Sequence, residues 1–224
     1  PAWADATPST GFRQNTPDDG QPASERTEVF VVYNDDTIFF GIVCYVRDPS
    51  TIIVSDSRRD SSLQETDSFQ LILDTYLDEQ NGFVFGTNPA GVEYDGQVTN
   101  EGQGSGRGFA GSQQQGGSGG GFNLNWDGVW QVNARVSEIG WTAEIAIPFR
   151  TIRFPSGEAQ TWGINFQRNI RARNEQSYWA PLPRQFNLNR LSLAGELQGI
   201  DVPAQRNLKL TPYLLGKTVQ RKVD

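Results

Sequence analysis

Residues 130–149, WQVNARVSEIGWTAEIAIPF, hold two runs in which apolar and polar side chains alternate. The first run places its apolar side chains at Trp130, Val132, Ala134 and Val136. The second run places them at Trp141, Ala143, Ile145 and Ile147, before Pro148 ends it. A period of two is that of a β-strand with one buried face. The stretch therefore predicts two strands that each cover one side of a hydrophobic core.

The same alternation recurs on both sides of this stretch. Residues 27–46, TEVFVVYNDDTIFFGIVCYV, are two β-rich runs around the turn cluster Asn34–Thr37, and they predict a hairpin. Further strand-like runs occupy residues 69–73, 82–87 and 161–172. Many short strands with polar outer faces and Gly, Pro, Asn and Asp corners are typical of an antiparallel sandwich. We therefore expect an all-β fold, an antiparallel β-sandwich over residues 1–200, followed by a C-terminal arm over residues 201–224.

The strand phases also predict which side chains form the core. They are Phe30, Val32, Phe69, Leu71, Trp130, Val132, Trp141, Ile145, Trp162 and Ile164. In the first strand of the hairpin both phases are apolar, so Val29, Val31 and Tyr33 are the alternative inward set. Cys44 lies in an apolar run and is expected to be a buried thiol.

Composition excludes several classes of function. The 224 residues include no histidine and one cysteine, so neither a Ser-His-Asp triad nor an internal disulfide can form. A net charge of −7 argues against sequence-independent nucleic-acid binding, which requires a basic face. No apolar run has the length of a transmembrane helix. A hydrolase built on two carboxylates stays chemically open, but nothing selects a partner for Glu144, and we expect a non-catalytic module.

A glycine-rich tract, residues 102–121, precedes the strand pair at residues 130–149. Half of its residues are glycine, so ordering it is entropically costly, and we expect a long loop held by contacts beyond its own sequence. Its anchors would be Arg107, Phe109 and Phe122. Other candidate contact residues, for a sugar or for a protein partner, are Tyr178, Trp179, Arg171 and Arg173. Each of them has a structural alternative, as a packed aromatic or as part of a solvated, salt-bridged strand end with Arg168.

Three aspartates form a candidate metal site. Asp74, Asp78 and Asp95 could supply the carboxylate oxygens that calcium prefers. Their spacing does not match an EF-hand loop, and turn formation is the alternative role for aspartates in such positions. These three aspartates therefore either bind a structural calcium ion or form turns.

The order of several short motifs resembles the carbohydrate-binding family 9-like domain that precedes a C-terminal barrel-like region in bacterial envelope proteins. The matching segments are Pro1-Ala2-Trp3, Thr27-Glu28-Val29, Tyr33-Asn34-Asp35-Asp36, Arg58-Arg59-Asp60, Asp67-Ser68-Phe69, Leu73-Asp74-Thr75, Asn88-Pro89-Ala90-Gly91, Trp126-Asp127-Gly128, Gly140-Trp141-Thr142-Ala143-Glu144, Ile147-Pro148-Phe149 and Trp162-Gly163-Ile164-Asn165. The resemblance covers about residues 1–200 and implies a β-sandwich; some members of the family carry structural calcium.

The resemblance also implies a sugar clamp of two tryptophans. Residues 63–66, where the first is expected, contain no aromatic side chain, and residues 82–85 lack the expected arginine. Trp179 corresponds to the second tryptophan of the clamp. The barrel-like region is reduced to residues 207–220, NLKLTPYLLGKTVQ.

Two functions follow from this resemblance. The first is a protein-interaction or assembly subunit of a larger membrane-associated complex, such as a respiratory or photosynthetic one, without a transmembrane segment of its own. The alternative is a carbohydrate-binding module that recognises glycan by aromatic stacking. Both imply export to the periplasm or cell envelope, and since the chain begins at Pro1 without a signal peptide, we expect a processed product.

Overall fold

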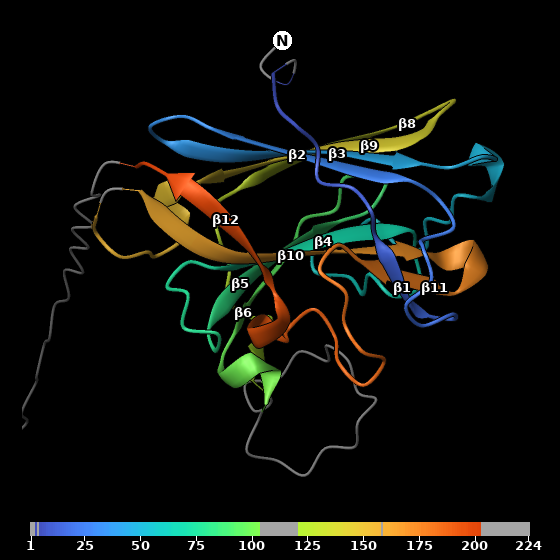
Figure 1. Cartoon of the computed structure of the whole chain (residues 1–224). Helices are drawn as coiled ribbons and strands as arrows, with labels where there is room; N and C mark the ends of the chain where they lie inside the picture. Colours follow the sequence, from blue (N-terminus) through green and yellow to red (C-terminus); the bar gives the residue numbers. More distant parts are fainter. Residues whose placement is uncertain (1–2, 4, 104–120, 158, 203–224) are drawn as a thin grey trace, which may run out of the picture.

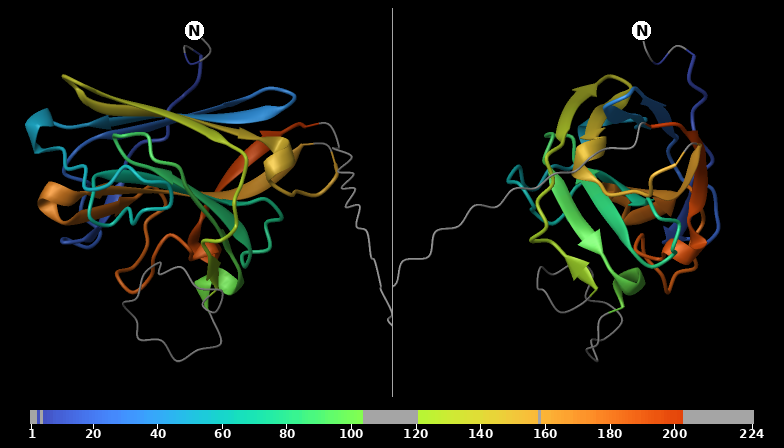
Figure 2. Two further views of the ribbon diagram at one scale, coloured as in Figure 1. Left: turned by 180° about the vertical axis from the view of Figure 1, so that it is seen from behind. Right: turned by 90° about the vertical axis from the view of Figure 1, so that its left-hand side faces the viewer.

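The chain forms two antiparallel β-sheets packed face to face (Figure 1). The structure is a computed structural model and describes residues 3, 5–103, 121–157 and 159–202. Figure 2 shows the two layers from behind and from one end. The all-β antiparallel sandwich predicted from the alternating strands is confirmed.

The order of the strands in each sheet follows from their pairing. The four-stranded sheet contains β2 (Thr27–Tyr33), β3 (Thr37–Tyr45), β9 (Gly140–Pro148) and β8 (Gln131–Ser137), in that spatial order. The larger sheet contains β1 (Arg13–Thr16), β11 (Glu175–Tyr178), β10 (Gln160–Ile170), β4 (Ser68–Asp74), β5 (Gly82–Thr87), β6 (Tyr94–Val98) and β7 (Phe122–Asn123), with β12 (Gly195–Ile200) paired to β10. Short 3₁₀ turns lie at η1 (Pro49–Thr51), η2 (Asn100–Gly102), η3 (Phe149–Thr151), η4 (Arg171–Arg173) and η5 (Leu191–Leu193). None of the helical turns in these described ranges has the length and apolar character needed to cross a membrane.

The predicted hairpin is β2 and β3. Its turn is held by Asn34, whose side-chain oxygen accepts hydrogen bonds from the backbone N–H groups of Asp36 (3.0 Å) and Thr37 (2.9 Å). An Asx turn of this kind closes the loop between two strands. β3 then pairs with β9 over its whole length, and β9 pairs with β8. Strands that are far apart in the sequence thus form one continuous outer layer.

The core between the sheets follows the predicted phases closely. On β9, Trp141, Ala143, Ile145 and Ile147 are all buried. Aromatic rings join the two sheets, since Phe166 on β10 packs against Phe40 on β3 at a centroid distance of 6.3 Å. Phe69, Leu71, Trp130, Trp162 and Ile164 are also buried, and Val132 is partly buried against the same cluster. Burial of this apolar surface is the main source of stability for such a sandwich.

The predicted inward phase of β2 is wrong for two residues. Phe30 and Val32 face the outer side of the sheet, whereas Val29 is fully buried and Val31 packs against the core. Because side chains alternate along a strand, the register with β3 decides the face of every residue at once. The alternative phase was therefore correct for Val29 and Val31, while Tyr33 at the strand end is 42% exposed.

A buried arginine connects the two sheets. The side chain of Arg168, on β10, has no exposed surface. Its guanidinium donates to the backbone oxygens of Arg26 (2.8 Å) and Tyr45 (2.7 Å) and to the hydroxyl of Thr27 (2.9 Å). The expectation that Arg168 belongs to a solvated strand end is therefore wrong. The side chain reaches inward because the open end of the hairpin presents carbonyl groups that have to be hydrogen-bonded.

The described part of the sandwich continues to Val202, which is 2% exposed and belongs to the core. The preceding residue, Asp201, is fixed to β2, since its N–H donates to the hydroxyl of Tyr33 (3.2 Å). The rest of the expected arm, residues 203–224, and the central part of the glycine-rich tract, residues 104–120, lie outside the described residues.

We predict that Cys44 is unreactive in the folded protein. The thiol is fully buried, and burial raises its pKa to about 11, although the positive charge of Arg168 acts in the opposite direction. Because the thiolate is the reactive species, labelling with a thiol reagent at pH 8 should be slow in buffer and rapid in denaturant. Native labelling as fast as that of a free cysteine would contradict this assignment.

We predict that Arg168→Met lowers the free energy of unfolding by at least about 2 kcal/mol, because it removes three buried hydrogen bonds, although the carbonyl of Arg26 keeps the N–H of Tyr45 as a donor. Urea unfolding followed by tryptophan fluorescence measures the change. Arg171→Met is the matched control, because its guanidinium pairs with Glu65 at the surface and should contribute less than about 1 kcal/mol. A more stable Arg168→Met protein would mean that desolvation of the charge outweighs its hydrogen bonds.

Candidate functional site

The outer face of the four-stranded sheet carries a row of small and polar side chains. Gly41 on β3 pairs with Glu144 on β9, which pairs with Asn133 on β8. Two residues further along each strand, on the same face, Thr142 on β9 pairs with Arg135 on β8. Since side chains of one phase share a face, all of these lie on the side away from the core.

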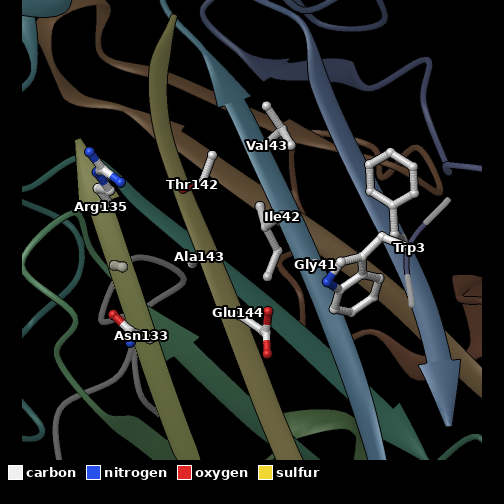
Figure 3. A pocket seen from close by; sticks show the side chains of 11 residues that line it. Trp3, Gly41, Ile42, Val43, Asn133, Arg135, Thr142, Ala143 and Glu144 are labelled. Atoms are coloured by element: carbon white, nitrogen blue, oxygen red, sulfur yellow. The ribbon is translucent and has the colours of Figure 1, made fainter. Parts of the chain in front are cut away.

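Trp3 lies across this face, above Gly41 (Figure 3). A Cβ atom at position 41 would lie 3.2 Å from the indole ring, so glycine leaves the space in which the ring rests. Phe30 supports the indole from the side, with the two rings edge to face at a centroid distance of 6.5 Å. The N-terminal segment thus places a half-buried aromatic ring on the solvent side of the sheet.

Trp3 and the row beside it border an open hollow of about 430 Å³. We call it the outer groove; its lining includes Trp3, Gly41, Val43, Asn133, Arg135, Thr142 and Glu144. Figure 3 shows Glu144 between Trp3 on one side and Asn133 on the other. The volume lies within the range of small-molecule sites, roughly 300–1,000 Å³.

The polar groups of the outer groove are available to a ligand. Glu144, Asn133 and Arg135 are exposed, and none of the three side chains takes part in a hydrogen bond or ion pair among the described residues. Together they offer a carboxylate acceptor, an amide that both donates and accepts, and a guanidinium donor. Glu144 is the one carboxylate among the described residues of the lining. The groove therefore suits binding of a polyhydroxylated ligand and lacks the carboxylate pair of a glycoside hydrolase.

Two of the contact residues expected from the sequence belong to the interior. Tyr178 is 1% exposed, and burial raises the pKa of its hydroxyl. Phe122 is 8% exposed and stacks on Tyr94 at a centroid distance of 6.4 Å. Burial leaves Tyr178 no surface for a partner, whereas Phe122 packs on the larger sheet, as expected of an anchor of the glycine-rich tract.

Trp179, which the resemblance assigns to a sugar clamp, packs against neighbouring strands of the larger sheet. Its ring packs against Phe166 at a centroid distance of 5.6 Å. β12 closes over the other part of the ring, since a Cβ atom at Gly195 would lie 2.5 Å from it. The side chain is half-buried and is part of the core boundary. These contacts support the packed-aromatic alternative for Trp179, and its role in a sugar clamp stays a prediction.

The basic residues after β10 form ion pairs. Arg171 pairs with Glu65 (2.7 Å) and Arg173 with Glu25 (2.8 Å). For these two arginines the salt-bridged alternative is confirmed, and their charge is compensated within the chain. Arg107 and Phe109, the other anchors expected from the glycine-rich tract, lie outside the described residues.

The three candidate calcium ligands do not fit a shared metal site. Asp74 accepts hydrogen bonds from the N–H groups of Tyr76, Asp78 and Glu79, and Asp78 accepts from Gln80 and Asn81. Asp95 pairs with Arg59 (2.8 Å) and accepts from the N–H of Gly128 (2.7 Å). Donors that point at the carboxylate oxygens occupy the lone pairs that a cation would need. The described part of the chain contains no group of three or more acidic or cysteine side chains suited to a metal ion.

The outer groove was not predicted from the sequence, although two residues signal it. Trp3 was used only as part of a family motif, and its contact with Gly41 joins residues that are far apart in the sequence. Gly41 interrupts an apolar strand, and glycine in a strand interior often marks the close approach of another group. That glycine could have indicated a ligand platform or a packed ring on the outer face.

Comparison with known proteins identifies the fold. No protein-family model and no curated protein matches the sequence. Among solved structures, a candidate carbohydrate-binding protein of Bacteroides uniformis is similar with a TM-score of 0.62 and 12% identity, over 86% of each chain. A carbohydrate-binding module of family 9 from Caldicellulosiruptor kristjanssonii, in complex with cellotriose, is similar with a TM-score of 0.52 and 12% identity, over 94% of this chain and 89% of that one.

The same module in complex with glucose has a TM-score of 0.52 and 14% identity, over 92% of this chain and 89% of that one. At such identities the likeness concerns the fold alone, since one fold hosts many functions. The chain therefore has the β-sandwich fold of family 9 carbohydrate-binding modules, as the resemblance implied.

We predict that Gly41→Val displaces the indole of Trp3 and leaves the sandwich intact. The new side chain would occupy the space under the ring, whereas valine itself suits a strand interior better than glycine does. The melting temperature should stay equal or rise, and acrylamide quenching of tryptophan fluorescence should increase. In a Trp3→Phe background the same substitution should leave quenching unchanged. A large loss of melting temperature would show that Gly41 serves the core instead.

Proposed function

We propose that this chain is a non-catalytic carbohydrate-binding module that holds glycan in the outer groove. The observation that carries the proposal is the half-buried indole of Trp3 beside three side chains without partners among the described residues. A sugar ring presents C–H groups on its faces and hydroxyl groups around its edge. An aromatic surface with convergent polar groups matches both features.

The fold supports the same function. The similar solved structures include modules in complex with cellotriose and with glucose. Trp179 packs against Phe166 and near Gly195, so the proposal rests on the outer groove and not on a site carried over from those modules. Binding without catalysis agrees with Glu144 being the single carboxylate of the described lining.

The assembly role expected from the sequence has no support in the comparisons, whose proteins are described as carbohydrate-binding. It rested on the incomplete clamp and on the reduced barrel-like region. The incomplete clamp no longer argues against sugar binding, because the outer groove is a candidate site elsewhere on the sandwich. The structure does not bear on the reduced barrel-like region, because residues 203–224 lie outside the described part of the chain. An envelope location agrees with glycan binding and stays a prediction.

Titration calorimetry with a panel of neutral mono-, oligo- and polysaccharides, including glucose and cellotriose, tests the proposal. We expect at least one ligand with measurable affinity, and we expect Trp3→Ala to weaken it at least about tenfold, because a stacked aromatic side chain dominates such sites. Tyr76→Ala is the matched control, since Tyr76 is an exposed aromatic residue (52%) outside the groove.

Two results would contradict the proposal. One is the absence of binding to every glycan of the panel, and co-purification of envelope subunits from native cells would then favour the assembly role. The other is a glycan whose affinity is the same for Trp3→Ala as for the wild-type protein, which would place the binding site elsewhere on the sandwich.

A further inference from the structure

Trp3 separates the outer groove from a second hollow. This hairpin-side hollow has a volume of about 330 Å³ and is lined by Val32, Tyr33, Asn34 and Phe39, together with Trp3 and Glu144. Trp3 and Glu144 also line the outer groove. One aromatic ring and one carboxylate are therefore shared by two hollows on the same face.

The register of the sheet orders the two hollows along the strands. Phe39, in the hairpin-side hollow, pairs with Ala146, and Gly41 under the indole pairs with Glu144. Val43, in the outer groove, pairs with Thr142. Because a strand rises about 3.3 Å per residue, the path from Phe39 to Val43 is about 13 Å long. The hollows thus follow one another along β3 and β9, with Trp3 and Glu144 between them.

The two hollows differ in chemistry. The hairpin-side hollow presents apolar surface from Val32 and Phe39. The hydroxyl of Tyr33 is already engaged, since it donates to Gly199 (3.0 Å) and accepts from Asp201 (3.2 Å). The oxygen of Asn34 accepts from the turn. This side therefore favours stacking, while the outer groove, with Asn133 and Arg135, favours hydrogen bonds.

Resting on the glycan-binding function proposed above, we propose that the two hollows form one continuous site for an internal stretch of a linear neutral glycan, with consecutive sugar rings on either side of Trp3. A single sugar would fill only one hollow and would contact either the apolar surface of Val32 and Phe39 or the polar groups of Asn133 and Arg135. A chain of two or three rings contacts both.

The charge distribution selects a neutral chain. Glu144 lines both hollows, and it has no ion-pair partner among the described residues. Every ring that contacts Trp3 therefore also lies near a carboxylate. Hydroxyl groups donate to a carboxylate, whereas the carboxylate of a uronic acid is repelled by it. Arg135 lines only the outer groove, so it does not compensate Glu144 in the hairpin-side hollow.

Calorimetry with two ladders of β-1,4-linked sugars tests the proposal. The ladders are glucose to cellotetraose and mannose to mannotetraose, with trigalacturonate as the anionic probe. In the ladder that binds, we expect affinity to rise at least about tenfold from one ring to three and to change little from three to four. Borohydride reduction of the tetraose should change affinity less than about twofold, because an internal stretch needs no chain end. Trigalacturonate should not bind.

Variants at the two ends of the site test its continuity. Val32→Asn changes the hairpin-side hollow and Arg135→Gln changes the outer groove. Each should reduce the increase in affinity from the monosaccharide to the trisaccharide at least about threefold. Arg153→Gln, an exposed arginine outside both hollows, is the matched control and should leave the ladder unchanged.

The outcomes separate this inference from the proposed function. If a monosaccharide binds as tightly as the trisaccharide, or if reduction of the chain end abolishes binding, the site takes a chain end and the inference is wrong, while glycan binding itself stands. If trigalacturonate binds better than the neutral chains, the assigned charge selection is wrong. If no neutral ligand binds the wild-type protein, the proposed function fails and the inference fails with it.

Discussion

The guanidinium of Arg168 is the interaction on which the relation between the two sheets depends. It extends from β10 in one sheet to the open end of the β2–β3 hairpin in the other and satisfies two backbone carbonyls and a hydroxyl there. The guanidinium has no ion-pair partner among the described residues, so these hydrogen bonds, together with the negative charge of Asp67, compensate for its lost hydration. These hydrogen bonds fix the open end of the hairpin to β10. They therefore also position the outer surface of β2 and β3 relative to the larger sheet.

The outer surface shows how one sheet can serve two purposes. Its inner phase, with Phe40 and Ile145 as typical members, packs against the other sheet. Its outer phase combines Gly41 with exposed polar side chains, and the missing side chain at Gly41 is replaced by the indole of Trp3. The ring has contacts on two sides, with Gly41 below it and Phe30 beside it. Stability and recognition are thus assigned to opposite faces.

The likeness to carbohydrate-binding modules illustrates the separation of fold and site. At 12–14% identity the sandwich is retained. The position that the resemblance assigns to a sugar-stacking tryptophan, Trp179, is half-buried here and packs against Phe166 and near Gly195 of β12. A binding site is a local arrangement of a few side chains, so it can be lost or relocated without a change in the fold. The outer groove, where we propose that glycan binds, is a different local arrangement, on the other sheet.

The sequence by itself determined the fold class, the hairpin of β2 and β3, and the inward phase of β4, β9 and β10, because a period of two with turn residues at its ends depends only on local geometry. It left the phase of β2 open, since both phases are apolar there, and only pairing with β3 decided it. Burial of Arg168 and of Tyr178 was also decided by tertiary structure, because a polar or amphipathic side chain is placed inside only when distant groups hydrogen-bond it or cover it. The outer groove depends on the contact between Trp3 and Gly41, and no local pattern brings together two residues so far apart in the chain.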